Sequence, residues 1–357
     1  MAVTRRIFRV TVDFCFKVLI LHIIYSVATI ILGIETSCDD TAAAVLVDGK
    51  LCANIVSQQL EHQAHGGVIP ELASRAHVQR IVPVVEAALS KANIDKKDLT
   101  AVAYTQGPGL LGSLLVGNAF SKSLALALAI PLIAVHHMQA HLLVHFIDDD
   151  YPTPTFPFLG LTVSGGHTQL VQVDGAATFT VLGQTKDDAA GEAFDKTGKM
   201  LGLPYPAGPL MDKYAKKGKA KFSFGKPTVE GLDFSFSGLK TSVLYYLREQ
   251  QDKDSKFIEK NLYDLCASVQ KAIVDILMEK VVNAFAKTGL NQLVLGGGVS
   301  ANSELRKALE NTTSNVFLPP LPYTTDNAAM IAMAGHLKLK ENKIDSLESE
   351  SKARIPI

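Results

Sequence analysis

The chain has 357 residues, with 35 basic and 35 acidic side chains and a formal net charge of zero. This length exceeds one ordinary hydrophobic core, so we expect two domains, and zero net charge excludes a global field that would attract a polyanion, so contact with a nucleic acid needs a local patch. The four cysteines form no Cys-x-x-Cys pair, which argues against a disulfide framework and a thiolate zinc site.

Residues 1–28 differ in composition from the rest of the chain. Arg5, Arg6 and Arg9 precede an apolar run at 18–28, as in signal peptides and short anchors. The run continues into the first expected strand without a cleavage site, and what precedes that strand is too short to span a bilayer. A start codon assigned too early is favoured; a mitochondrial presequence and a membrane segment are the alternatives. We expect a cytoplasmic protein without membrane contact, or a mitochondrial one if these residues are a presequence.

An internal repeat follows. Residues 31–41 read Ile-Leu-Gly-Ile-Glu-Thr-Ser-Cys-Asp-Asp-Thr, and residues 158–168 read Phe-Leu-Gly-Leu-Thr-Val-Ser-Gly-Gly-His-Thr. In both copies an apolar strand runs into Ser-x-x-x-Thr and a second strand follows. Hairpin tips of small and hydroxyl residues expose backbone N–H groups to an anion, so two facing tips would hold a phosphate between two domains. The alternative is two unrelated hairpins with similar turns.

The first half continues with alternating helices and strands. Hydrophobic periodicity predicts helices at 71–91 and 113–129, and short apolar runs predict strands at 99–104 and 131–135. A further helix is expected to begin near His136. Residues 148–157, with three acids and three prolines, are the best candidate for a domain boundary.

The second half repeats this plan. We expect an irregular section rich in glycine and lysine at 183–240, then helices at 243–248 and 262–288 and a strand at 292–295. A last helix at 324–340 is expected to return to the first domain, and the charged residues 341–357 to be solvated. The expected division is an N-terminal extension (1–28), a first domain (29–150 with 325–345), a second domain (151–324) and a charged tail (346–357).

Two histidines suggest a metal site. His137 and His141 stand at i and i+4 of an expected helix, where both imidazoles can reach one ion. Met138 occupies the place of the glutamate in a His-Glu-x-x-His protease, which argues against that chemistry. The third ligand would be distant in sequence, and Asp326 is the candidate. A coincidental histidine pair, with Asp326 as a helix N-cap, is the alternative.

Four other segments suggest a nucleotide and an RNA. Residues 294–302 read as a strand, three glycines and a helix start, which let the backbone approach a flat or anionic ligand closely, and Asn302 can read a base or ribose. Segments 187–196 and 206–212 carry carboxylates suited to ribose hydroxyls or to solvated helix faces. Residues 213–226 hold six lysines, no acid and three aromatic residues. This composition fits phosphate contact with base stacking, or a solvated loop.

Five segments together resemble one enzyme family. Residues 34–41, 67–77, 137–141, 163–168 and 296–302 are similar to the bacterial and mitochondrial branch of the tRNA adenosine threonylcarbamoyltransferases. The resemblance runs from about residue 30 to residue 340. It implies an α/β fold of the duplicated actin-like and sugar-kinase-like (ribonuclease H-like) class with a central cleft. It also implies transfer of the threonylcarbamoyl group from threonylcarbamoyl-adenylate to the exocyclic amine of the adenosine 3′ of the anticodon, in tRNAs reading ANN codons, with release of AMP.

The resemblance also assigns residues. His137, His141 and Asp326 would bind one Fe²⁺ or Zn²⁺ ion. The resemblance assigns no acceptor for the proton of the amine; from position alone, Asp39 or Asp40 is the candidate. Thr162 stands where the archaeal and eukaryotic branch has a tyrosine, which leaves the fourth metal position open. The residues implied to hold the adenylate are Thr162, Val163, Ser164, Gly165 and Gly166 at its phosphate and Asp195, Gly208, Asp212 and Asn302 at its ribose and adenine.

The implied partners are tRNA and, in bacteria, a paralogous actin-like subunit and a small ATPase; a mitochondrial-type protein would form a homodimer instead. Two rival functions share the fold. A sugar or acetate kinase would need a catalytic carboxylate and no histidine pair. A non-catalytic scaffold paralogue would lack the histidine pair and the nucleotide loops, which this chain has.

Overall fold

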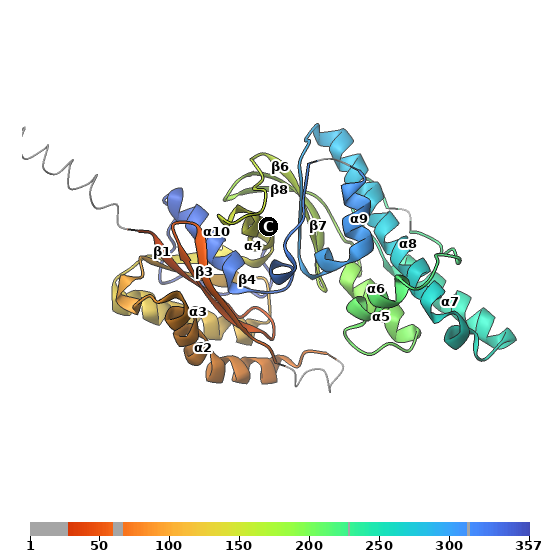
Figure 1. The fold of residues 1–357 in the computed structure, drawn as a ribbon, viewed down its shortest axis with the longest axis horizontal. Coiled ribbons are helices and arrows are strands. Elements are labelled where there is room, and N and C mark those ends of the chain that lie inside the picture. Colours follow the sequence, from red (N-terminus) through yellow and green to blue (C-terminus); the bar gives the residue numbers. More distant parts are fainter. Residues whose placement is uncertain (1–27, 60–66, 228, 313–314) are drawn as a thin grey trace, which may run out of the picture.

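The computed structural model describes residues 28–59, 67–227, 229–312 and 315–357. The expectations for the N-terminal extension therefore lie, apart from its last residue, outside the described part. Two five-stranded sheets form the centre of the molecule (Figure 1). Their strand orders, β3-β2-β1-β4-β5 and β10-β9-β6-β7-β8, are equivalent when the second is read backwards.

The internal repeat marks the central hairpin of each sheet. β1 (Ile30–Glu35) pairs antiparallel with β2 (Thr41–Val47) and parallel with β4 (Ala101–Gly107). β6 (Phe158–Val163) pairs in the same way with β7 (Thr168–Gly175) and β9 (Leu293–Gly296). The chain therefore contains a structural duplication. The outer strands are β3 (Lys50–Ser57), β5 (Leu132–His136), β8 (Thr178–Gln184) and β10 (Val316–Phe317).

Burial explains why these central strands read as continuous apolar runs. Every residue of β1 and of β6 is buried, because helices cover both faces of each sheet. β3, at a sheet edge, is only partly buried. The first sheet thus has two cores, one on each face.

Two long helices cover the outer face of the first sheet. α2 (Pro70–Ala92) begins with a proline in its first turn and ends at Asn93, whose left-handed conformation closes the helix. α3 (Leu111–Leu128) follows β4 and packs against it and against α2. By length and composition alone α3 could cross a membrane, a property shared by core helices of soluble proteins.

Two helices lie between the sheets (Figure 1). α4 (His137–Leu143) contacts β6 and β9 on one side and α10 (Ala328–Lys340) on the other. α10 packs on β1, β2 and β4, so the end of the chain returns to the first sheet as expected. Short 3₁₀ segments connect the elements at Lys96–Asp98, Val144–Phe146, Gly298–Ala301 and Leu321–Tyr323.

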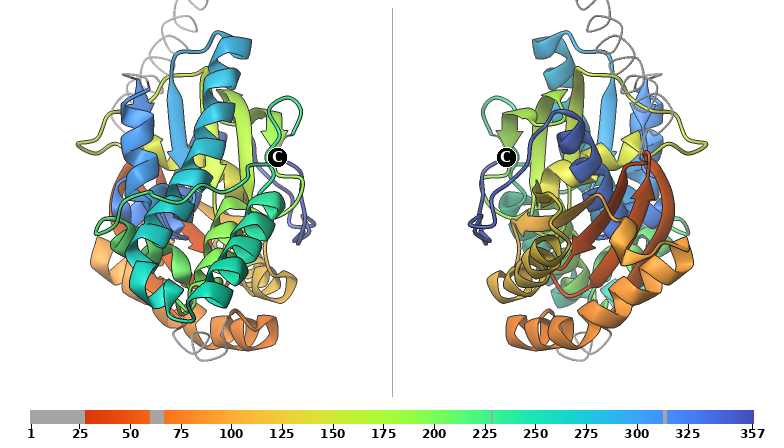
Figure 2. Two further views of the ribbon diagram at one scale, coloured as in Figure 1. Left: turned by 90° about the vertical axis from the view of Figure 1, so that its right-hand side faces the viewer. Right: turned by 90° about the vertical axis from the view of Figure 1, so that its left-hand side faces the viewer.

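The outer face of the second sheet carries the remaining helices (Figure 2). Two of them, α5 and α6, lie in the section expected to be irregular, so that expectation was wrong. The buried face of α5 is formed mainly by alanine, glycine and threonine, so it contains few of the large apolar residues that mark a core helix in sequence. These helices are α5 (Ala190–Met200), α6 (Ala207–Ala215), α7 (Ser237–Lys253), α8 (Phe257–Thr288) and α9 (Ser303–Glu310).

The tail is not simply solvated, which corrects another expectation. The backbone of Asp345 donates to the Leu132 carbonyl at 2.9 Å, and its carboxylate accepts the Ala134 N–H at 2.8 Å. Farther on, Ser349 hydrogen-bonds the hydroxyl of Tyr104 at 2.7 Å. β5 is an edge strand with unpaired backbone groups, and the tail satisfies some of them.

Candidate metal and nucleotide site

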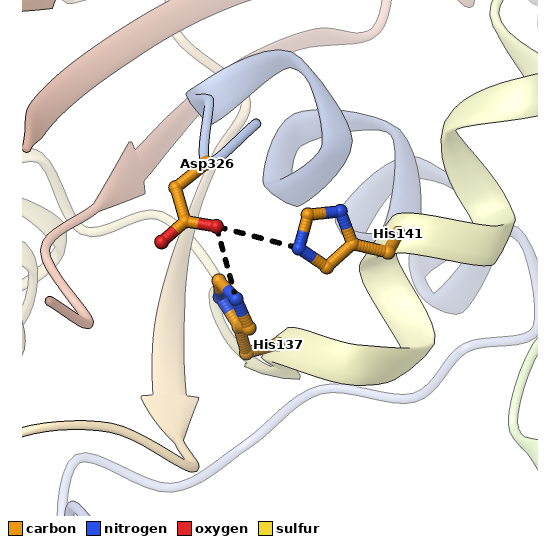
Figure 3. Close-up of side chains that lie close together, drawn as sticks. All are labelled: His137, His141 and Asp326. Carbon is orange, nitrogen blue, oxygen red and sulfur yellow. Dashed lines mark ion pairs between the residues drawn. The ribbon is translucent and has the colours of Figure 1, made fainter. Parts of the chain in front are cut away.

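The histidine pair and the distant aspartate meet between the sheets (Figure 3). Nε2 of His137 lies 3.3 Å from Oδ1 of Asp326, and Nε2 of His141 lies 3.4 Å from the same oxygen. The three donor atoms lie within 4.8 Å of one another. Tetrahedral ligands at about 2.1 Å from an ion are about 3.4 Å apart, which matches both separations. Two imidazoles and one carboxylate fit Fe²⁺ or Zn²⁺ and leave a coordination position open.

Asp326 is not the N-cap of the last helix. The side chain of Asn327 accepts the Met330 N–H at 3.1 Å, so Asn327 caps α10. Asp326 precedes the helix and is turned toward α4 (Figure 3). The alternative assignment for this residue is therefore wrong.

Glu35, at the end of β1, orients His137. Its Oε2 lies 3.0 Å from Nδ1 of His137 and accepts the Thr105 hydroxyl at 2.6 Å, while Oε1 accepts the Ser37 N–H. A carboxylate on Nδ1 places the ring proton there and leaves Nε2 free for an ion. Sequence reasoning quoted Glu35 in the family motif without a role, because only the fold brings β1 next to α4.

Charges in this buried cluster shift the pKa values of its members. Burial alone would lower the pKa of His137, but Asp326 and Glu35 raise it well above its usual value. Burial opposes ionisation of Asp326, yet the two histidines hold its pKa well below its usual range. Burial lowers the pKa of His141, which favours the neutral form that ligates metals. The buried carboxylate of Glu35 and the partly buried carboxylate of Asp326 therefore make a site that attracts a cation.

The tip of the first hairpin lies beside this cluster, and hydrogen bonds from a histidine of α2 hold it in place. His77, a buried residue of α2, contacts the Thr41 hydroxyl at 2.8 Å and the Cys38 carbonyl at 3.0 Å. Within the tip, burial and the charge of Asp39 raise the pKa of Asp40 to about 7. A carboxyl group with that pKa is suited to accept a proton at neutral pH.

A cavity of about 380 Å³ opens next to the tip of the second hairpin. Residues from four segments line it: the hairpin tip, α5, the start of α6 and the glycine-rich turn after β9. Five of the nine residues assigned to the adenylate are among them, namely Gly165, Asp195, Gly208, Asp212 and Asn302. A cavity of this size suits a nucleotide.

The other four assigned residues lie elsewhere. Thr162 and Val163 are buried within β6, and the Thr162 hydroxyl has no hydrogen-bond partner within the described residues. Ser164 and Gly166 belong to the tip but do not line this cavity. The Ser164 hydroxyl accepts the His167 N–H at 3.0 Å and so shapes the tip.

Several polar groups in the cavity also hold the protein together. Asn302 caps α9 through the Leu305 N–H at 3.0 Å and donates to Gln270 at 2.8 Å. Asp195 accepts the Ala207 N–H at 2.8 Å, which ties α5 to α6. The cavity is therefore pre-formed by its own hydrogen bonds.

Comparison with known proteins gives the family. The family model described as tRNA N6-adenosine threonylcarbamoyltransferase matches residues 50–333. A protein of that name from Christiangramia forsetii is 58% identical over 322 residues, covering 88% of this chain and 95% of the relative. Another, from Cytophaga hutchinsonii, is 53% identical over 338 residues, covering 93% and 98%. The chain belongs to this family of transferases.

Solved structures agree on the fold. HypF from T. kodakarensis superposes with a TM-score of 0.58 at 14% identity, over 89% of this chain and 48% of that protein. Component A of the Acidaminococcus fermentans (R)-2-hydroxyglutaryl-CoA dehydratase gives 0.51 at 16% identity, over 87% and 99%. The expected duplicated actin-like, sugar-kinase-like fold is thereby confirmed.

The lysine run at 213–226 is less available than its sequence indicated. Lys216, Lys221 and Lys226 pair with aspartates at 2.8, 2.5 and 3.1 Å. Of the interleaved aromatic residues, Phe224 is buried, and Tyr214 and Phe222 are partly buried against the core of the second domain. This packing makes the rings less suited to stacking with RNA bases, whereas the exposed lysines without an aspartate partner still fit phosphate contact.

Proposed function

We propose that this family member transfers a threonylcarbamoyl group from threonylcarbamoyl-adenylate to the exocyclic amine of a tRNA adenosine. One observation carries the proposal: the cluster of His137, His141 and Asp326 lies beside the same hairpin tip that lines the nucleotide cavity. An acyl group attached to a nucleotide phosphate at that tip would be presented to the cluster. The adenosine is the one 3′ of the anticodon, as the family resemblance implies.

The chemistry needs three functions from the chain. The amine nitrogen attacks the carbamoyl carbon, the bond from that carbon to the phosphate oxygen breaks, and AMP leaves. Asp40, with its pKa raised to about 7, would accept the proton that the amine loses. The Gly165 tip would hold the phosphate. A divalent Fe²⁺ or Zn²⁺ ion bound by His137, His141 and Asp326 would supply Lewis-acid polarisation of the acyl oxygen.

The test is a transfer assay with protein purified without a chelating tag. Synthetic threonylcarbamoyl-adenylate and unmodified tRNA are supplied, together with the paralogous subunit and the small ATPase, and modified adenosine and AMP are measured. We expect one modified adenosine per AMP released, and no product with His137→Ala. ATP-dependent phosphorylation of a sugar panel without any transfer would contradict the proposal and favour a kinase.

The paralogous partner has a suitable surface in α2 and α3. Leu72, Val78 and Val82 of α2 and Leu111 and Leu115 of α3 are exposed although large and apolar. These helices pack together on the outer face of the first sheet (Figure 1), so the residues belong to one side of the molecule. Exposed apolar groups gathered in this way mark protein interfaces. We propose that a second actin-like subunit binds here; Val78→Glu should then prevent complex formation in size-exclusion chromatography.

A further inference from the structure

A small cavity of about 280 Å³ lies between the C-terminal tail and the second hairpin. The tail contributes residues 353–356, and the opposite wall is formed by His167, Gln169 and Gln184. His136 and Met138, at the start of α4, close the cavity. None of the functions assigned above uses this cavity.

The lining is rich in hydrogen-bond donors and contains no acid. Arg354 is its one charged residue, and it has no ion pair within the described part of the chain. The side-chain oxygen of Gln169 is buried and has no hydrogen-bond partner among the described residues. A guanidinium without an ion pair, next to an amide oxygen that can accept a hydrogen bond, suits a small anion that also carries a hydrogen-bond donor.

The tail that carries Arg354 is held in place. The backbone of Lys352 donates to the Gln106 carbonyl at 2.9 Å, and Gly109 donates to the Ala353 carbonyl at 3.2 Å. Nδ1 of His136 accepts the Met138 N–H, so its Nε2 donates to the Ile355 carbonyl, each at 3.2 Å. The wall is therefore pre-formed.

The cavity adjoins the metal ligands. His136 and Met138 flank His137 in sequence, and both line the cavity together with His167. Gly165, on the same hairpin tip as His167, lines the nucleotide cavity. The two cavities thus meet at one hairpin tip, next to the cluster of His137, His141 and Asp326.

We infer that this cavity binds the threonyl part of the acyl group. Arg354 would pair with its α-carboxylate, and the side-chain oxygen of Gln169 would accept a hydrogen bond from its hydroxyl group. The inference rests on the proposed function, which supplies the acyl-adenylate. With the phosphate at Gly165 and the acyl carbon beside the metal cluster, the amino-acid portion must extend beyond the cluster. The cavity is roughly large enough for one amino-acid-sized group and too small for a drug-sized ligand. A guanidinium can pair with a carboxylate through two parallel hydrogen bonds.

The test compares three ligands on the metal-loaded full chain by calorimetry: AMP, a non-hydrolysable threonylcarbamoyl-adenylate analogue, and the same analogue without its carboxylate. Arg354→Ala should weaken binding of the carboxylated analogue by about tenfold or more and leave the other two unchanged. Arg354→Lys should recover part of the loss. The matched control is Lys352→Ala, which removes a positive charge from the same tail but not from the cavity lining.

Each other outcome has a defined meaning. If Arg354→Ala binds the carboxylated analogue as the wild-type chain does, the subsite is refuted and the proposed function stands. Equal weakening of AMP would place Arg354 at the phosphate and also refute it. If the wild-type chain binds neither AMP nor the analogue, the proposed function fails together with the subsite.

Discussion

The two hairpin tips occupy equivalent positions in the duplicated sheets but differ in chemistry. The first, between β1 and β2, follows Glu35, contains Asp39 and Asp40, and is fixed by His77. The second, between β6 and β7, contains Gly165 and Gly166, around which an added Cβ would meet no atom within 4 Å. One tip therefore concentrates carboxylates beside the metal cluster, and the other is open for an anion. Hairpins that pair in the same way thus carry tips of different charge and different free space.

The largest expected effect comes from removing Asp326, the carboxylate ligand beside the acidic first tip. Asp326→Ala should lower metal affinity by at least about 100-fold and abolish transfer, because only two ligands remain. Metal content by mass spectrometry and the transfer assay check this. Asn327→Ala is the control: it should cost about 1 kcal/mol of stability through loss of the cap and retain the ion. Full metal content in Asp326→Ala would refute the site.

Asp40→Asn should reduce turnover by about 100-fold or more, since general base catalysis contributes that much. In the wild-type enzyme the deprotonated form of Asp40 increases as pH rises through about 7, so activity should rise over the same range. Asp39→Asn removes a neighbouring negative charge and should move this midpoint to lower pH. An unchanged pH profile in Asp40→Asn would show that another group accepts the proton.

Glu35→Gln tests whether the carboxylate at the end of β1 orients the metal ligand His137. Loss of the carboxylate on Nδ1 of His137 should weaken metal binding by about 10- to 100-fold. Thr105→Val, which removes a hydrogen bond to Glu35 but keeps the carboxylate, should have a smaller effect. Unaltered metal affinity in Glu35→Gln would indicate that packing alone orients the ring.

At the tip of the second hairpin, Gly165→Val should weaken AMP binding by about tenfold, or about 1.4 kcal/mol, because the new side chain enters the nucleotide cavity. Metal content should not change. Gly166→Val places the same side chain on the same tip outside the cavity lining and should bind AMP normally. Equal losses in the two variants would mean that the phosphate spans the whole tip.

The smallest effect should come from the lysine run, outside both tips. Lys216 pairs with Asp212 in the nucleotide cavity, so the informative variant replaces Lys213, Lys217 and Lys219 with alanine. Affinity for tRNA should fall several-fold, and its salt dependence should decrease by about one unit of slope per lost phosphate contact. Replacing Lys96 and Lys97, in the 3₁₀ segment between α2 and β4, is the control. An unchanged salt slope would move the RNA surface elsewhere.

Sequence reasoning found what repeats or has regular spacing. The duplicated hairpin, the His137 and His141 pair and the return of α10 all follow from local patterns. It missed α5 and α6 because their buried faces consist largely of small residues, and it missed the role of Glu35 because that contact joins β1 to α4. The tail was misjudged because its charge suggested solvation, whereas its hydrogen bonds to β5 and to the end of β4 are made largely by its backbone. Contacts set by tertiary structure leave no periodic signal.

The position of Asp326 in the chain has a consequence for biosynthesis. Every strand of both sheets precedes it, while the two histidine ligands belong to the first half. A ribosome adds residues from the N-terminus, so a nascent chain acquires two ligands long before the third. The complete cluster cannot assemble until almost the whole polypeptide has emerged. Retention of a tightly held ion would therefore report that synthesis has reached the last helix, and prematurely terminated chains would be released without it.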